Sequence, residues 1–200
     1  MANDMKHDSA VAAVQSPKRR LHGAGFTIVE LVVVIILLGI LAATALPRFI
    51  DIEDEAHAAA VSCVYGSLQT GVSLFHSNWI AEGEAPANSQ LADFNNLRTN
   101  AAGYPYGTDD NSGGAGSNVV DSDDCVAVFQ NVLQAGAPSI TAQANTAAVV
   151  NNATDYAAVR SGNNCLFYYT AQNNQSGEQV DLLTYNADTG AITRTQPTLP

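Results

Sequence analysis

The chain has 200 residues and a formal net charge of −11, with 46% hydrophobic and 14% charged residues. This length allows one domain with room for an appendage. Half of the eight Lys and Arg residues lie before residue 26, so residues 26–200 carry 4 basic against 17 acidic side chains. Such an acidic surface repels phosphate backbones, so sequence-independent nucleic-acid binding gets no electrostatic help, and we expect no nucleic-acid partner.

A basic cluster, Lys18, Arg19 and Arg20, precedes a long apolar segment. Sixteen consecutive uncharged residues run from Leu31 to Leu46, and 21 residues lie between Phe26 and Leu46 inclusive. As a helix this segment is roughly 32 Å long, enough for a bilayer core of about 30 Å. The basic cluster is expected to stay in the cytoplasm, and the chain after the apolar segment is expected to be exported.

An ordinary secretory signal peptide is the alternative reading of this region. Its cleavage site would be Ala43-Thr44-Ala45, before Leu46. Two features count against it. Glu30 stands near the head of the apolar run, where an unpaired carboxylate costs about 2.5–3.5 kcal/mol in a membrane, and the helical pattern continues beyond Ala45.

The stretch GFTIVELVVVIILLGILAATALPRF, residues 25–49, closely resembles the N-terminus of type IV pilins and their pseudopilin relatives. In that family a prepilin peptidase cuts after a glycine and methylates the new N-terminal residue, and a glutamate stands fifth. The resemblance places the cut between Gly25 and Phe26, predicts N-methylated Phe26, and makes Glu30 the fifth residue. The following run ALPRFIDIEDEAHAAAV resembles the major pilins of the mannose-sensitive haemagglutinin (MSHA) type.

This resemblance implies an assembly role for three residues. Cleavage creates a positive amine at Phe26, and in a bundle of subunits Glu30 of one chain can pair with that amine of its neighbour. The alternative is that Glu30 only reaches the membrane interface near the cytoplasmic leaflet. Gly39 and Pro47 stand where the family has helix-loosening residues, and the segment between them is expected to bend or melt on packing; a mildly kinked helix is the alternative.

Beyond Pro47 the sequence predicts an amphipathic helix over residues 51–79. Its apolar residues recur every three or four positions, a pattern that predicts one buried face: Val61, Val64, Leu68, Val72, Phe75 and Trp79. A face of this kind needs a cover, and a sheet packed on one side is the expected one.

Residues 80–122 are expected to form a loop region, because Gly, Asp, Asn and Ser are dense there. Asp109, Asn111 and Gly114 resemble the start of an EF-hand loop. Gly113 and Val120, however, stand at positions where that loop needs ligands. We therefore predict a solvated acidic loop and no metal site.

Residues 123–200 predict a short helix followed by an antiparallel meander. The helix is expected within residues 121–138, with Asp and Ser caps at its start and with Gly136 and Pro138 to end it, and residues 134–154 are expected to form an irregular surface segment. Four strand-like runs separated by hairpin-turn residues follow, at 156–160, 165–171, 179–185 and 191–195. The predicted fold class is therefore α+β: a long N-terminal helix, half hydrophobic and half amphipathic, packed on an antiparallel meander, as the resemblance to the type IV pilin fold implies.

Three cysteines remain after the proposed export. Cys125 and Cys165 are expected to form a disulfide in an oxidising periplasm, and the resemblance to the disulfide-bounded C-terminal region of type IV pilins favours the same pair. Closing a loop of this size is worth roughly 3–4 kcal/mol. Cys63 lies mid-helix and is predicted to be a small buried core residue; the alternative is a bridging or reactive thiol.

Catalytic chemistry finds little support in the sequence. The exported part has two histidines, His57 and His76, both on the predicted helix. Glu53 and His57 are four residues apart, which is more typical of a helix-surface pair than of half a metal site. No Ser-His-Asp arrangement, phosphate loop or CxxC motif is visible, so we expect no enzyme, no cofactor and no metal.

Together these expectations predict that the chain is a structural subunit, a major pilin that polymerises into a type IV pilus. The pilus is expected to serve in surface adhesion and also in motility. The expected parts are a leader (1–25), a hydrophobic assembly helix (26–50) and a globular head (51–200). The expected partners are other copies of the chain, the prepilin peptidase and N-methyltransferase, the assembly machinery and the inner membrane; the sequence names no surface ligand. The precursor would lie in the inner membrane of a Gram-negative bacterium and the product in an extracellular filament. The alternatives are a pseudopilin of a type II secretion system, and a secreted binding or enzymatic domain released by an ordinary signal peptidase.

Overall fold

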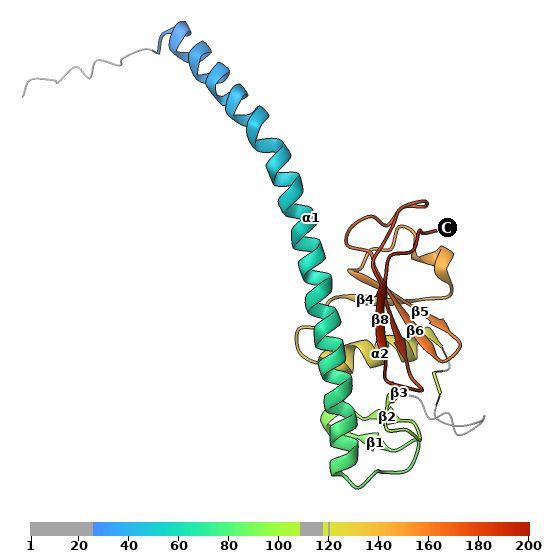
Figure 1. Ribbon diagram of the computed structural model, residues 1–200. Coiled ribbons are helices and arrows are strands. Elements are labelled where there is room, and N and C mark those ends of the chain that lie inside the picture. The colour runs from blue at the N-terminus through green and yellow to red at the C-terminus, as the bar shows by residue number, and fades with distance from the viewer. Residues whose placement is uncertain (1–25, 109–117, 120) are drawn as a thin grey trace, which may run out of the picture. The chain divides into compact units, whose positions relative to one another are not determined.

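The computed structural model describes residues 26–108, 118–119 and 121–200 (Figure 1). The predicted leader, with Lys18, Arg19, Arg20 and Gly25, lies outside the described residues. The EF-hand-like pattern at 109–120 falls almost wholly outside them too. The chain divides into two compact units, Met1–Phe49 and Ile50–Pro200.

Helix α1, Ile28–Ala81, has 54 residues and contributes to both units. Its backbone stays helical through Gly39 and Pro47, so neither residue ends the helix in the single chain. The expected loosening between them on assembly stays a prediction. In the first unit, Ile28–Ala45 has a mean hydropathy of 2.8, and it is long and apolar enough to cross a membrane.

In the second unit, α1 buries the predicted stripe. Val61, Leu68, Val72, Phe75 and Trp79 all belong to the main core, and Val64 packs against it. The helix ends in a Schellman motif: the N–H of Gly83 donates to the carbonyl of Ile80, and the N–H of Glu84 donates to that of Trp79, both at 3.0 Å. Gly83 has φ of +87°, which favours glycine at this position. The amphipathic helix is confirmed, and it extends two residues beyond the predicted end.

The prediction of a loop over 80–122 is wrong in part, because three short strands form a small antiparallel sheet there. They are β1 (Gln90–Leu91), β2 (Leu97–Thr99) and β3 (Pro105–Gly107), with the 3₁₀ helix η1 (Ala92–Phe94) between the first two. Asn95 and Asn96 both take positive φ, at 51° and 60°, and turn the chain into β2. Leu91, Leu97 and Tyr106 of this sheet are fully buried.

Five strands form the larger sheet, in the order β4-β5-β6-β7-β8. The predicted meander is confirmed as four antiparallel strands: β5 (Tyr156–Ser161), β6 (Asn164–Tyr169), β7 (Leu182–Asn186) and β8 (Ile192–Thr195). The prediction that 134–154 is irregular is wrong, because β4 (Ile140–Gln143) pairs with β5 in parallel and the 3₁₀ helix η2 (Thr146–Val149) follows it.

The larger sheet is covered on both faces, which places the core. On one face lie α1 and helix α2 (Ser122–Leu133), with Phe129, Phe167 and Leu183 in the main cluster. On the other face a second cluster includes Val149 and Leu199. Residues of β5 alternate between the two clusters, as strand geometry requires. The α+β fold class is therefore confirmed.

Candidate assembly site

The start of α1 is capped by its own sequence. The backbone N–H of Glu30 donates to Thr27 Oγ1 at 3.2 Å, and the N–H of Leu31 donates to the Thr27 carbonyl at 3.2 Å. Thr27 is thus the N-cap of a helix that begins at Ile28, and Glu30 occupies the third helical position. The sequence analysis missed Thr27, although its spacing to Glu30 is the T-x-x-E pattern of a capping box. A carboxylate in the first turn is also favoured by the helix dipole.

Nothing within the described chain covers the apolar half of α1. The side chain of Phe26 is 81% exposed, and large apolar residues from Ile28 to Leu41 are exposed as well. Each Ile or Leu side chain is stabilised by about 1.5–3 kcal/mol when it leaves water. An apolar surface this extensive is typical of a segment that meets a membrane or another protein.

The predicted assembly residues lie in or beside this segment. Phe26 and Glu30 are both exposed, and no described residue forms an ion pair with Glu30. A Cβ added at Gly39 would meet no described atom within 4 Å, so packing among the described residues does not require this glycine. Pro47 lies within α1, and its side chain is outside the described part. Among the described residues, Glu30 therefore has the cap and no counter-charge.

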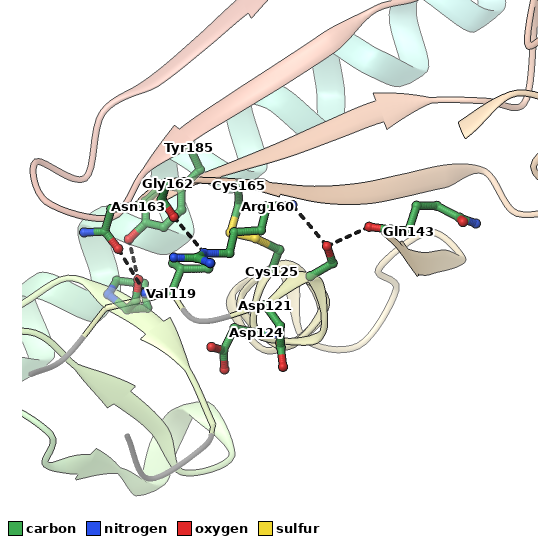
Figure 2. The surroundings of a disulfide bond; sticks show 12 residues. Val119, Asp121, Asp124, Cys125, Gln143, Arg160, Gly162, Asn163, Cys165 and Tyr185 are labelled. Carbon is green, nitrogen blue, oxygen red and sulfur yellow. Dashed lines mark hydrogen bonds between the residues drawn. A yellow bond between two sulfur atoms is a disulfide. The ribbon is translucent and has the colours of Figure 1, made fainter. Parts of the chain in front are cut away.

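A disulfide closes the head (Figure 2). Cys125 of α2 and Cys165 of β6 are bonded, as predicted, with their Cα atoms 5.3 Å apart and both residues buried. Beside them Ser122 Oγ donates to the Gln143 carbonyl at 2.7 Å and accepts from the Arg160 N–H at 3.1 Å. The helix, β4 and β5 are thus joined next to the disulfide, which fixes α2 on the sheet.

The prediction that Cys63 is buried is wrong, since Cys63 is an exposed free thiol. It lies two residues after the fully buried Val61. Two residues correspond to about 200° around a helix, so Cys63 points away from the face that Val61 buries.

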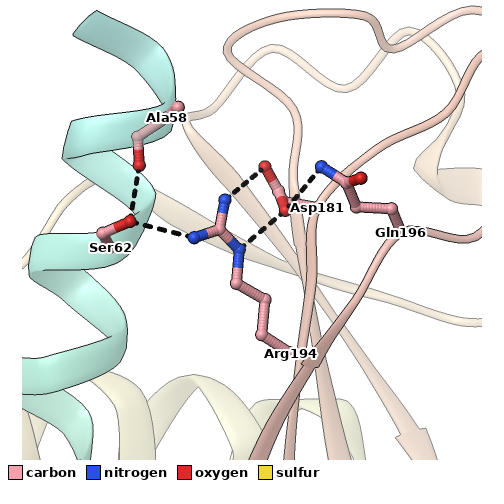
Figure 3. A network of polar contacts seen from close by, with 5 residues as sticks. All are labelled: Ala58, Ser62, Asp181, Arg194 and Gln196. Carbon is pink, nitrogen blue, oxygen red and sulfur yellow. Dashed lines mark hydrogen bonds and ion pairs between the residues drawn. The ribbon is translucent and has the colours of Figure 1, made fainter. Parts of the chain in front are cut away.

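A polar network joins α1 to the C-terminal strands (Figure 3). The guanidinium of Arg194 donates two hydrogen bonds to Asp181, at 2.8 and 3.1 Å, and one to Ser62 Oγ at 2.9 Å. Gln196 Nε2 donates to the same carboxylate at 3.2 Å. The hydrogen bonds to Asp181 raise the pKa of Arg194. Arg194 therefore stays charged and links the strands to Ser62 of the helix.

The two histidines take part in packing. His57 Nδ1 lies 2.6 Å from the Tyr169 hydroxyl oxygen, so this pair also links α1 to β6. His76 stacks between Trp79 and Tyr104, with ring centroids 5.4 and 4.6 Å away. Each histidine is thus engaged with aromatic residues of the head.

Tyr156, Tyr169 and Tyr185 are buried in the core of the head. Burial raises the pKa of the Tyr156, Tyr169 and Tyr185 phenols. The Tyr185 hydroxyl donates to the Pro105 carbonyl at 2.7 Å, which ties the larger sheet to the smaller one. The buried Tyr156 hydroxyl has no hydrogen-bond partner among the described residues.

Comparison with known proteins gives one partial relative. The chain is 37% identical over 54 residues to the type IV narrow pilus major component PilA5 of Thermus thermophilus. The aligned stretch covers 27% of this chain and 47% of that protein, so it spans about half of the relative's length. No family model matches the chain, and no solved structure matches it.

The fold of the described chain and the partial match agree with each other. The described chain has an apolar N-terminal helix followed by an α+β head with antiparallel sheets, which is consistent with the type IV pilin fold. The partial match to PilA5 supports the type IV pilin family for this chain.

Proposed function

We propose that this chain is the major subunit of a type IV pilus of the MSHA type, carried by a Gram-negative bacterium and used in surface adhesion. The observation that carries the proposal is the N-terminal segment of α1. It is a capped helix with exposed apolar side chains and one acidic residue in its first turn. The similarity to a pilus major component over 54 residues supports the same role.

Maturation is the first proposed step. The prepilin peptidase would cut between Gly25 and Phe26 on the cytoplasmic side and then methylate Phe26. The new amine would lie four residues before Glu30, with Thr27 as the cap between them. The helix Ile28–Ala45 would hold the subunit in the inner membrane until assembly.

Assembly is the second proposed step, and Glu30 supplies its selectivity. In the filament, the exposed apolar side chains of α1 would be covered by those of other copies, which replaces lipid contacts with protein contacts. Glu30 would pair with the Phe26 amine of a neighbouring copy. Because an unpaired buried charge costs several kcal/mol, only subunits in the right axial register would be stabilised.

The head would form the surface of the filament. Residues 50–200 carry 16 acidic and 3 basic side chains, a formal charge of −13, so this surface would be soluble and strongly acidic. The disulfide Cys125–Cys165 is suited to an oxidising extracellular setting. In this proposal the head is structural, and no step of it requires catalysis.

A pseudopilin of a type II secretion system is the second candidate, because it shares the same N-terminal pattern. The disulfide and the long C-terminal meander favour a pilin. Electron microscopy of material sheared from the cell surface separates the candidates, with an antibody against the head as the label. We expect long, thin, labelled filaments. Labelled material found only in the periplasm would favour a pseudopilin, and soluble protein in the medium would favour a secreted domain.

A further inference from the structure

An open groove lies between the head half of α1 and the C-terminal end of α2. It encloses about 600 Å³, and Cys63, Gly66, Thr70 and Leu74 of α1 line one side of it. Phe94 and Leu133 are among the residues on the other side. The two helices approach closely beside it, since a Cβ added at Gly71 would lie 2.5 Å from Val132 Cγ1.

The lining of this groove differs from the rest of the head in charge. None of the described residues that line it is acidic or basic, although residues 50–200 have a formal charge of −13. Leu74 at its edge is 58% exposed. An uncharged groove with an exposed leucine, on a head of this charge, is typical of a surface that receives an uncharged partner.

Gly66 gives a second and independent reason to expect a partner. A glycine in the interior of a helix makes that helix less stable than an alanine would. A Cβ at Gly66 would meet no atom within 4 Å, so packing inside the described chain does not explain the glycine. Gly71 differs, because Val132 occupies the space where its Cβ would be. A missing side chain at position 66 therefore leaves room for atoms from outside the chain.

The charges of the two parts of the chain indicate which part of a second copy the groove receives. The head of a second copy would be repelled, because both heads are acidic. The segment Ile28–Ala45 has Glu30 as its single charged residue, and its side chains lack cover in the described chain. We propose that the groove at Cys63, Gly66 and Leu74 receives the apolar helix Ile28–Ala45 of a second copy. This inference rests on the proposed function and names one contact of the filament.

The native thiol at position 63 allows a direct test. Ile35, Ile36, Leu37 and Leu38 are changed to cysteine one at a time in the full chain, and filaments are treated with a mild oxidant. We expect a disulfide-linked dimer through Cys63, formed several-fold more at the positions on one helical face than on the opposite face. Two controls are made on each cysteine variant. The first adds Cys63→Ser, and the second adds both Cys63→Ser and Ser77→Cys, which moves the native thiol to an exposed position of α1 outside the groove. Both controls should lose the dimer.

A second pair of variants tests the groove without crosslinking chemistry. Gly66→Leu places a larger side chain in the groove, and its Cβ would meet no described atom within 4 Å, so we expect the monomer to fold as before. Ser73→Leu adds the same side chain at an exposed position of α1 that does not line the groove. We expect Gly66→Leu to reduce filament yield several-fold and Ser73→Leu to leave it unchanged.

The outcomes separate this inference from the proposed function. Filaments with no dimer through Cys63, with equal dimer from all faces, or with a crosslink inside one chain would overturn the groove contact and leave the pilus role standing. Full filament yield from Gly66→Leu would do the same. If the wild-type chain forms no filament and none of the four cysteine variants gives the dimer, both proposals fail.

Discussion

Gly71 of α1 lies so close to Val132 of α2 that a Cβ on the glycine would stand 2.5 Å from Val132 Cγ1 and 2.7 Å from its carbonyl oxygen. Five residues earlier in α1, a Cβ added at Gly66 would have no described atom within 4 Å. The two glycines therefore serve different purposes, the first inside the chain and the second outside it.

Alanine at these two positions should change stability in opposite directions. We expect Gly71→Ala to lower the free energy of unfolding by about 1–3 kcal/mol, because the added methyl group overpacks the contact between the helices. Gly66→Ala should raise it by up to about 1 kcal/mol through helix propensity. Urea unfolding of both variants in mild detergent, followed by circular dichroism, measures the two values. Changes of the same sign would contradict this assignment.

The buried tyrosines predict alkaline unfolding. The folded-state pKa of Tyr156, Tyr169 and Tyr185 is raised above the ordinary value of 10.0. The stability that these neutral phenols contribute is therefore fully present below pH 10, and it is lost as the pH rises towards their folded-state pKa. Absorbance of phenolate during a pH titration should show these groups ionising together with unfolding. Independent ionisation in the folded chain would contradict the burial.

Tyr156 and Tyr185 form a matched pair within this set. The Tyr156 hydroxyl has no hydrogen-bond partner among the described residues, whereas that of Tyr185 donates to the Pro105 carbonyl at 2.7 Å. We expect Tyr156→Phe to raise the free energy of unfolding by about 1 kcal/mol and Tyr185→Phe to lower it by about 1 kcal/mol. Thermal unfolding at neutral pH distinguishes them, and a loss of stability in Tyr156→Phe would show that its hydroxyl is satisfied.

Much of this fold follows from side-chain periodicity. The stripe from Val61 to Trp79 repeats every three or four residues and is buried as predicted, and the four runs of the meander are separated by turn residues that the structure uses. The parallel strand β4 was missed because a run of four residues, Ile140–Gln143, carries too little pattern to separate it from a loop. Strands β1 to β3 have only two or three residues each and were missed for the same reason.

Exposure of single residues was harder to predict than the elements that carry them. Residue type predicts a buried Cys63, whereas its angle from the buried Val61 around the helix places it outside the core. The role of Thr27 as the helix cap is not evident from the apolar run, whereas the T-x-x-E spacing from Thr27 to Glu30 is the sequence signal that indicates it. The groove at Gly66 depends on the distance between two helices far apart in sequence, which no local pattern gives.

The disulfide should be a major source of stability in the head. Reduction of Cys125–Cys165 is expected to lower the free energy of unfolding by roughly 2–5 kcal/mol, since the bond closes a loop across 40 residues. Alkylation with N-ethylmaleimide gives the control. Of the three cysteines, only Cys63 should be labelled in the native chain, and all three after reduction and unfolding. A native chain that takes up three labels would contradict the pairing.

Glu30 should be needed for assembly and dispensable for processing. We expect Glu30→Val to be cut and inserted normally but to form no filaments, because the Phe26 amine of each neighbour is then buried without a partner, at roughly 3–5 kcal/mol. Thr27→Val is the matched control, since it removes the cap, at about 1 kcal/mol, and keeps the carboxylate. This control should still assemble. Equal filament yields from Glu30→Val and the wild-type chain would show that the carboxylate is a bystander.

The most direct test of the pilin role is the intact mass of the subunit in purified surface filaments. The proposed maturation predicts a single chain that begins at Phe26, carries one methyl group on its N-terminus and holds one disulfide. Fragmentation of the N-terminal peptide places the methyl group. A mature chain that begins at Leu46, without the helix Ile28–Ala45 and its Glu30, would contradict the pilin role and identify an ordinary secreted protein.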